Sequence, residues 1–258
     1  MSDTAAMAAA RIAFENVVQR FRLIRERPDT LREVFTQIFR NRSSYHEFEA
    51  LKNVSFSISD GQVVGIIGRN GSGKSTTLKI IAGVYTPTSG EVTVSGTVAA
   101  LIELGAGFHP DLTGRENILV NGLLLGLTKR EIRACEQRVL DFAELGEFID
   151  SPIKQYSSGM LMRLGFAIAT EVDPDMLLMD EILAVGDAAF QEKCIARIDD
   201  FRQRKKTIVF VSHDMAAVRR ICQRVLLIHE GRLLADGPPD EVAARYEELV
   251  HYPAAAAS

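Results

Sequence analysis

The sequence has no tryptophan and only three cysteines, Cys135, Cys194 and Cys222, which lie far apart in the chain. Their number is odd and their spacing fits no metal site, so we expect free thiols in a reducing compartment. No uninterrupted apolar run approaches the roughly 18 residues that a membrane-spanning helix requires. The first ten residues lack the basic start and long apolar core of a signal peptide. These absences predict a cytosolic chain that works at a membrane only through a partner.

The chain also lacks a strong charge of either sign. Its 30 basic and 34 acidic residues give a net charge of −4, which offers no support for a nucleic-acid partner. Hydrophobic residues make up 47% of the sequence and charged residues 25%, and both values fit an ordinary globular protein. The 258 residues suit one large α/β domain or two small ones.

A glycine-rich segment follows the apolar run Val63–Ile67, and its residues 68–75 fit the phosphate-binding pattern G-x-x-x-x-G-K-[ST]. Glycines let backbone N–H groups crowd around phosphates, and the positive end of the following helix points at the same charge. Lys74 is expected to reach the β- and γ-phosphates and Ser75 to ligate Mg²⁺. The competing interpretation is an ordinary glycine-rich turn. The predicted nucleotide-binding residues here are Gly68, Asn70, Gly71, Ser72, Gly73, Lys74, Ser75 and Thr76.

Two further apolar strands are expected to end in polar side chains. Residues 176–179 lead into Asp180 and Glu181, and residues 207–212 lead into His213. Parallel strands deliver such side chains to the ligand-binding edge of an open sheet. Asp180 is then placed to hold Mg²⁺, Glu181 to deprotonate the attacking water, and His213 to face the γ-phosphate. The alternatives are an Asp-Glu pair that caps the next turn and a structural histidine.

A second candidate anion site begins at Ser157. As the N-cap of a long helix, with Gly159 behind it, Ser157 leaves free backbone N–H groups at a positive helix end. Read in isolation, the segment is an ordinary well-capped helix.

The order of elements predicts an α/β fold with a mixed sheet, an antiparallel β region and an inserted α-helical subdomain. Residues 112–170 have a helical period, and strands alternate with helices after residue 176. A pair of strands is expected around Gly96, and Asp240 is expected to cap a last helix. We predict one domain over residues 1–251, with a helical insertion at about 29–41 and a disordered tail at 252–258.

Together these motifs, in this order, resemble those of ATP-binding cassette (ABC) ATPases over residues 11 to 250. The resemblance implies ATP and Mg²⁺ as ligands and two copies of the chain packed head to tail. Ser157 and Gly159 of one copy, with Ser158 between them, would then close on the γ-phosphate held by Lys74 of the other. It also implies a catalytic role for Lys74, with Glu181 as the base and His213 as a switch. Residues 184–187 would signal between the two sites.

Two departures from the usual family pattern are informative. Tyr156, Ser158 and Met160 replace three residues of the usual Leu-Ser-Gly-Gly-Gln, and Glu103 stands near the position of a glutamine that senses Mg²⁺. A carboxylate there can still reach Mg²⁺ through water. Similar features mark the ATPases of bacterial exporters for O-antigen, capsule, galactan or teichoic-acid chains.

This narrower resemblance implies two copies of a separate transmembrane permease, a lipid-linked glycan as cargo, and a place at the cytoplasmic face of the inner membrane. It also leads us to expect no C-terminal carbohydrate-binding domain. The competing interpretations are the ATPase of an importer or small-molecule exporter and a soluble, non-transport ABC ATPase.

Two assignments stay open at this point. Phe21 is the favoured aromatic for stacking on adenine, and Tyr45 is the alternative. The amphipathic helix expected at residues 30–40 either docks on the domain's own sheet or lies near the membrane and the entrance for the glycan.

Overall fold

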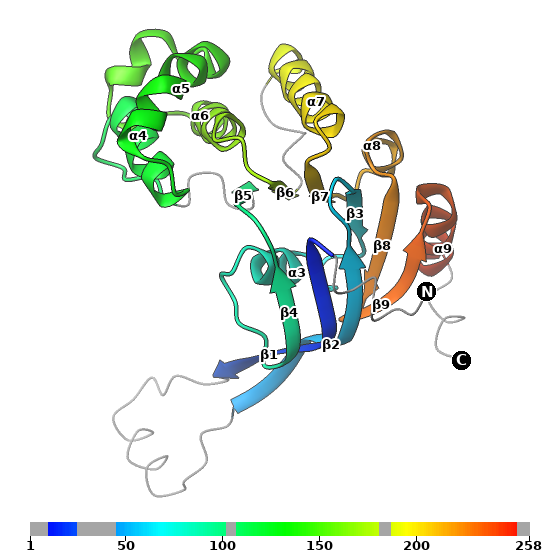
Figure 1. Cartoon of the computed structure of the whole chain (residues 1–258). Helices are drawn as coiled ribbons and strands as arrows, with labels where there is room; N and C mark the ends of the chain where they lie inside the picture. The colour runs from blue at the N-terminus through cyan, green and yellow to red at the C-terminus, as the bar shows by residue number, and fades with distance from the viewer. Residues whose placement is uncertain (1–9, 25–44, 102–106, 181–186, 252–258) are drawn as a thin grey trace, which may run out of the picture.

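The computed structural model describes residues 10–24, 45–101, 107–180 and 187–251. Within these ranges the predicted α/β class is confirmed, because helices cover a mixed sheet that is joined to a smaller antiparallel sheet (Figure 1). The predicted insertion at 29–41 and the predicted tail at 252–258 lie outside the described residues. No described helix is both long enough and apolar enough to cross a membrane.

The larger sheet carries the segments that matter for chemistry. Its strands are ordered β5 (Val98–Leu101), β6 (Met176–Asp180), β7 (Thr207–Val211), β3 (Val63–Ile67), β8 (Arg224–His229) and β9 (Arg232–Gly237). All neighbours are parallel except β8 and β9. Because β6, β7 and β3 are adjacent and parallel, the segments that follow them meet at one edge of the sheet.

The smaller sheet has the order β2 (Tyr45–Ile58), β1 (Ile12–Ile24) and β4 (Ser89–Val94), all antiparallel. The expected strand pair around Gly96 is therefore wrong: β4 pairs with β1, whereas β5 pairs with β6 in the larger sheet. Gly96 has a φ of 102°, and the backbone N–H and hydroxyl of Thr97 both donate to Asp175 Oδ2. These contacts turn the chain from one sheet to the other.

Alternation along the central strands sorts the core into two layers. Val64 and Ile66 pack with α3 (Lys74–Ile81) and with the antiparallel sheet. Val63 and Ile67 pack on the other side with helices α6 (Ser158–Glu171) to α9. The last three of these are α7 (Ala188–Gln203), α8 (Met215–Ile221) and α9 (Pro239–His251). Such alternation is what a strand with both faces buried requires.

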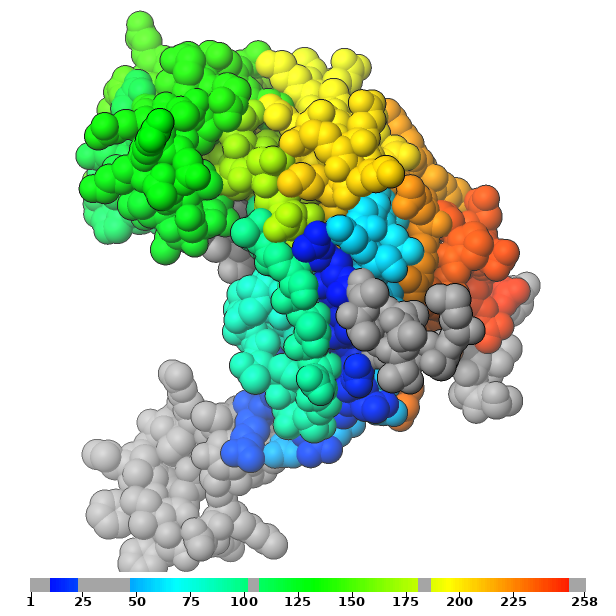
Figure 2. All heavy atoms as spheres, in the orientation of Figure 1, coloured from blue at the N-terminus to red at the C-terminus, as the bar shows by residue number. Residues whose placement is uncertain are grey.

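Helices α4 (Gly114–Leu124), α5 (Lys129–Ala143) and α6 (Ser158–Glu171) form a group at one end of the molecule, coloured green in Figure 1 and Figure 2. Short 3₁₀ segments, Gly146–Asp150 and Ile153–Gln155, lie between α5 and α6. Capping boxes start α4 at Thr113 and α5 at Thr128. Helix α6 belongs to two cores, because Leu164 packs among the helices while Phe166 packs against the large sheet.

The expectation that Asp240 caps the last helix is wrong by two residues. Helix α9 begins at Pro239, and the backbone N–H of Val242 donates to Pro238 O at 3.1 Å. Asp240 therefore lies in the first turn. Proline suits the first helical position because its fixed φ is already helical and its missing N–H has no intrahelical partner there.

Candidate active site

The loop after β3 is closed so tightly that two of its positions require glycine. Gly68 has a φ of 151°, and a Cβ there would lie 2.1 Å from Ile228 O. Gly73 has a φ of 113°, and a Cβ there would lie 2.7 Å from Ala50 O. At both positions the backbone conformation favours glycine, and there is no space for a larger side chain. The loop's backbone can therefore curve closely around a phosphate, as its sequence pattern predicts.

Lys74 is the first residue of α3, and its side chain folds back over this loop. Its Nζ donates to Gly68 O at 2.8 Å and to Arg69 O at 3.1 Å, and the residue is buried. Nearby, the Oγ of Ser72 is buried without a hydrogen-bond partner among the described residues. A buried polar atom left in this way marks a position where a ligand atom is expected. A phosphate fits the loop on this ground.

Ser75 and Asp180 approach each other from two elements. Ser75 Oγ, at the start of α3, donates to Asp180 Oδ2 at 3.3 Å, and Asp180 ends β6. A hydroxyl and a carboxylate oxygen facing each other are the donor types that Mg²⁺ prefers. The other predicted loop residues differ in exposure: Asn70 and Gly71 are exposed, and Thr76 is half-buried.

His213 follows β7, which lies between β6 and β3, so the histidine stands at the same edge of the sheet as the loop and Asp180. Its backbone is fixed on both sides. Asp214 N donates to Ser212 Oγ at 3.0 Å, and Asp214 Oδ1 accepts from Ala216 N at 2.8 Å to cap α8. The imidazole is exposed.

The structure places Ser157, Ser158 and Gly159 at the start of α6, among the helices rather than on the loop after β3. Ser157 Oγ accepts from Met160 N at 3.2 Å, which confirms it as the N-cap. Just before it, buried Tyr156 donates its hydroxyl to Phe148 O at 2.7 Å. Ser157 and Ser158 are exposed, so this helix end is open to a ligand or a second chain.

Arg163 is a residue that the motifs did not indicate. From the middle of α6 it donates to Asp187, and its guanidinium lies 4.8 Å from the ring centre of Phe190. Asp187 in turn caps α7 by accepting from Phe190 N at 2.9 Å, and this bond and then Arg163 lower the pKa of Asp187. Arg163 thus ties α6 to the end of the segment 184–187. The available signal was a lone cation within a long apolar helix.

Phe21 lies on β1 against an aromatic side chain that the motifs also missed. Its ring centre is 5.3 Å from that of Tyr85 in an edge-on arrangement, and Lys79 Nζ lies 5.8 Å from the centre of the Tyr85 ring. Tyr45 begins β2, but its side chain is outside the described residues, as are Glu103, Glu181 and residues 184–186.

Part of the passage after Glu103 is described, and Asn117 fixes it. The amide is fully buried: Oδ1 accepts from His109 N at 2.8 Å, and Nδ2 donates to Leu112 O and Thr113 O. These bonds hold residues 109–113 against the first turn of α4. The segment that leads from the sheet to the helices is therefore anchored at its far end.

Comparison with known proteins gives the class of protein that this fold and loop define. Residues 51–184 match the family described as ABC transporter, and the chain belongs to that family. The resemblance recognised in the sequence is thereby confirmed. The dimeric structure of a bacterial ABC transporter cassette has the same fold, with a TM-score of 0.71, 25% identity and coverage of 88% of this chain and 98% of that one.

Particular relatives are similar over most of the chain. An O-antigen export system ATP-binding protein, RfbB, from Klebsiella pneumoniae is 52% identical over 79% of this chain and 83% of its own length. RfbB from Myxococcus xanthus is 54% identical over 78% of this chain, which spans 46% of that protein. The teichoic acids export ATP-binding protein TagH from Listeria innocua is 43% identical over 94% of this chain and 71% of its own.

Proposed function

We propose that this chain is the ATP-hydrolysing subunit of an ABC transporter that exports a lipid-linked polysaccharide through a separate permease. The observation that carries the proposal is the 52% identity to an O-antigen export ATP-binding protein, combined with a phosphate-fitting loop at the expected position. The relatives named for O-antigen export and for teichoic acids export both support a glycan polymer as the class of cargo. We therefore propose a polysaccharide as the class of cargo, and ATPase assays with different glycans will identify which one is transported.

Within this proposal, ATP is held by the loop from Gly68 to Thr76. Support comes from the orphaned Ser72 hydroxyl, the buried Lys74 ammonium and the paired oxygens of Ser75 and Asp180. Lys74 would neutralise phosphate charge, and Ser75 and Asp180 would hold Mg²⁺, which supplies further charge neutralisation when bound. Phe21, beside Tyr85, would offer the aromatic face for adenine.

Glu181 and Glu103 enter the proposal from the sequence alone. Glu181 would orient and deprotonate the attacking water, His213 would face the γ-phosphate, and Glu103 would approach Mg²⁺ through water. We expect Glu181→Gln to lower turnover by about 10²- to 10⁴-fold while ATP binding persists. Turnover is measured by phosphate release and binding by a fluorescent ATP analogue. Near-normal hydrolysis by the purified variant would contradict the assignment.

The proposed assembly is a head-to-tail dimer on two permease subunits at the cytoplasmic face of the inner membrane. It is supported by the dimeric state of the similar cassette and by the exposed start of α6. Ser157, Ser158 and Gly159 of one copy would complete the site built around Lys74 in the other. Residues 30–40, whose structure is outside the described ranges, are kept as a candidate membrane-proximal segment.

The decisive experiment is reconstitution of the chain with a candidate permease, sought among the genes beside its own, followed by ATPase assays with candidate lipid-linked glycans. We expect co-purification of the two proteins and stimulation of hydrolysis by a glycan substrate. Stimulation by amino acids or drugs but not by any glycan would replace the proposed cargo with that of an importer or small-molecule exporter. Lack of permease binding would overturn the transport role.

A further inference from the structure

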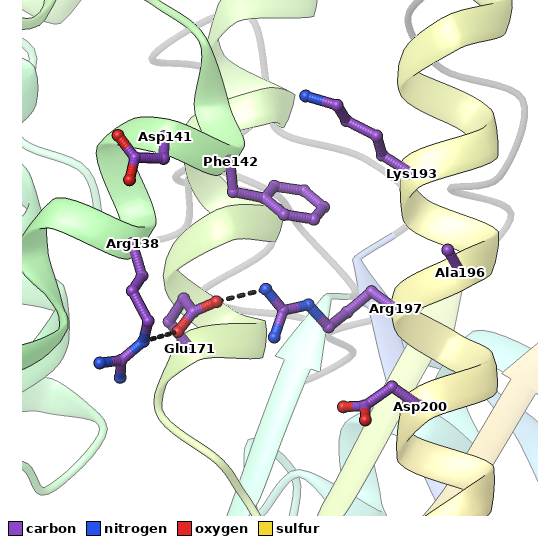
Figure 3. A pocket seen from close by; sticks show the side chains of 8 residues that line it. All are labelled: Arg138, Asp141, Phe142, Glu171, Lys193, Ala196, Arg197 and Asp200. Carbon is purple, nitrogen blue, oxygen red and sulfur yellow. Dashed lines mark hydrogen bonds and ion pairs between the residues drawn. The ribbon is translucent and has the colours of Figure 1, made fainter.

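A cavity of about 600 Å³ lies between α5, α6 and α7 (Figure 3). The buried carboxylate of Glu171 lies at the edge of this cavity. Figure 3 shows Glu171 of α6 with the guanidinium groups of Arg138, from α5, and Arg197, from α7, on opposite sides of it. The lining residues are Arg138, Asp141, Phe142, Glu171, Lys193, Ala196, Arg197 and Asp200.

Glu171 occupies a position that disfavours a negative charge. Its side chain is 5% exposed, and it is the last residue of α6, where the helix dipole is negative. A buried charge in such a place requires good compensation. Arg138 Nε donates to Oε2 at 2.6 Å, and Arg197 Nη2 donates to Oε1, so each carboxylate oxygen is satisfied by a different helix.

Aromatic packing reinforces the same junction. The Arg197 guanidinium lies 5.2 Å from the ring centre of Phe142 on α5. Phe142 in turn packs at 5.6 Å from Phe166 on α6 and at 5.6 Å from Phe190 on α7. One polar and aromatic contact set therefore joins α5, from the helical group, to α7, which packs on the large sheet.

We propose that Glu171 is a positioning residue that sets the angle of α6 against the large sheet and so places Ser157 and Gly159 for the partner copy's nucleotide. This inference rests on the proposed function. Helix α6 has 14 residues, about 20 Å at 1.5 Å per residue, with Glu171 at one end and Ser158 at the other. A tilt of about 5° at Glu171 moves the start of the helix by roughly 2 Å, enough to impair a site that depends on close positioning.

The test uses Glu171→Gln, which keeps the shape of the side chain and removes its charge. We expect unchanged ATP affinity of the monomer, because the loop after β3 is untouched. With the β,γ-imido analogue of ATP, the protein concentration for half-maximal dimerisation should rise by about three- to tenfold, and kcat should fall by a similar factor. Sedimentation, fluorescent-nucleotide binding and phosphate release give the three quantities.

Arg138→Gln provides a second variant in case Glu171→Gln folds poorly, because the Arg138 side chain is 59% exposed and its replacement removes little buried packing. It should also raise the protein concentration for half-maximal dimerisation. The double variant Glu171→Gln/Arg138→Gln should raise this concentration by less than the combined effect of the two single variants. Asp236→Asn is the matched control. Its carboxylate pairs with both Nε and Nη2 of Arg224 at 2.6 Å but joins β8 to β9 within the large sheet, so it should leave dimerisation unchanged.

Equal dimerisation and kcat for wild type, Glu171→Gln and Asp236→Asn would overturn the inference. So would equal losses in Glu171→Gln and Asp236→Asn, since these would indicate a general effect on stability. A wild-type chain that neither dimerises with the analogue nor hydrolyses ATP would instead contradict the proposed function. The two failures are therefore distinguishable.

Discussion

At the scale of single residues, Lys74 is the side chain on which we predict nucleotide binding to depend most. Its buried Nζ is held at the loop by two backbone carbonyl oxygens, so it meets a phosphate without a large change of conformation. We predict that Lys74→Ala lowers kcat/KM for ATP by about 10²-fold or more, because a preorganised positive charge is lost. Steady-state phosphate release measures the effect.

The control for this prediction is Lys129→Ala. Lys129 is exposed at the start of α5, so its replacement changes the net charge equally without touching the loop. An equal loss in both variants would assign the effect to net charge and contradict the role of Lys74.

A second prediction concerns Cys222, whose sulfur lies against Gly65 of β3. Burial raises the pKa of this thiol to about 12, whereas the pKa of a cysteine in an unfolded chain is about 8.5. Between these values the folded state keeps a proton that the unfolded state releases, so stability falls as pH rises. We predict that Cys222 contributes a loss of about 1.4 kcal/mol per pH unit in this window.

Denaturant unfolding of wild type and Cys222→Ala from pH 8 to 11 measures this contribution. The stability of wild type relative to Cys222→Ala should fall steadily above about pH 9. Curves that stay parallel over the whole range would show that Cys222 does not titrate with unfolding.

The sequence alone predicted which residues gather at the candidate active site, but it did not predict the side-chain contacts around them. Lys74, Ser75 and Asp180 could be recognised because each stands directly after an apolar strand or a glycine-rich turn. Arg163 and Tyr85 could not, because their partners, Asp187 and Phe21, are 24 and 64 residues away in the chain and meet them only through packing. Contacts between residues so far apart in the chain can be predicted only when the fold is known.

At the scale of elements, the start of α6 combines a structural and a proposed functional role in Ser157. Its hydroxyl caps the helix, so Ser157→Ala should lower the free energy of unfolding by about 1 kcal/mol. If the same helix end faces a γ-phosphate, the variant should also lower kcat by about tenfold. Denaturant unfolding and phosphate release separate the two effects.

Thr128→Ala is the matched control for this element. Thr128 caps α5 in the same helical group and accepts from Glu131 N, so its loss should cost similar stability. Its kcat should equal that of wild type. A comparable fall in kcat for both variants would assign the effect of Ser157 to stability alone.

The elements themselves were predicted to different degrees for a physical reason. Strands β3, β6 and β7 are short, apolar over at least four consecutive residues and bounded by polar turns, so local sequence defines them. The partners of β4 and β5 were assigned wrongly because pairing depends on segments about 80 residues away, which no local pattern reports. The start of α9 was misplaced because Pro239 outweighed Asp240 as a helix-starting signal.

At the scale of the whole molecule, the proposed head-to-tail dimer makes a prediction that no single chain can satisfy. Mixing Lys74→Ala with Gly159→Asp should restore ATPase activity that neither variant has alone. In a mixed dimer, one site combines the intact Lys74 of one copy with the intact Gly159 of the other. In an equimolar mixture about one site in four is then complete.

Gly159 suits this experiment because the monomer has room for a side chain there. Among the residues that the structure describes, an added Cβ would meet only Ser157 Oγ, at 3.9 Å, so the acidic side chain should disturb the partner's phosphate rather than the fold. A mixture no more active than the two separate variants would contradict sites shared between copies. The double variant Lys74→Ala/Gly159→Asp, mixed with itself, gives the baseline.

The position of β3 between β7 and β8 also bears on how the chain is made. The strand that precedes the glycine-rich loop is complete at Ile67, but the strands that flank it end at Val211 and at His229, the second of these about 160 residues later. At 5–20 residues per second, a ribosome takes about 8 to 30 s to synthesise that interval. During this time β3 and its loop lack the strands that flank them in the folded sheet. Bound nucleotide can therefore assist only the last stage of folding, after most of the polypeptide has left the ribosome.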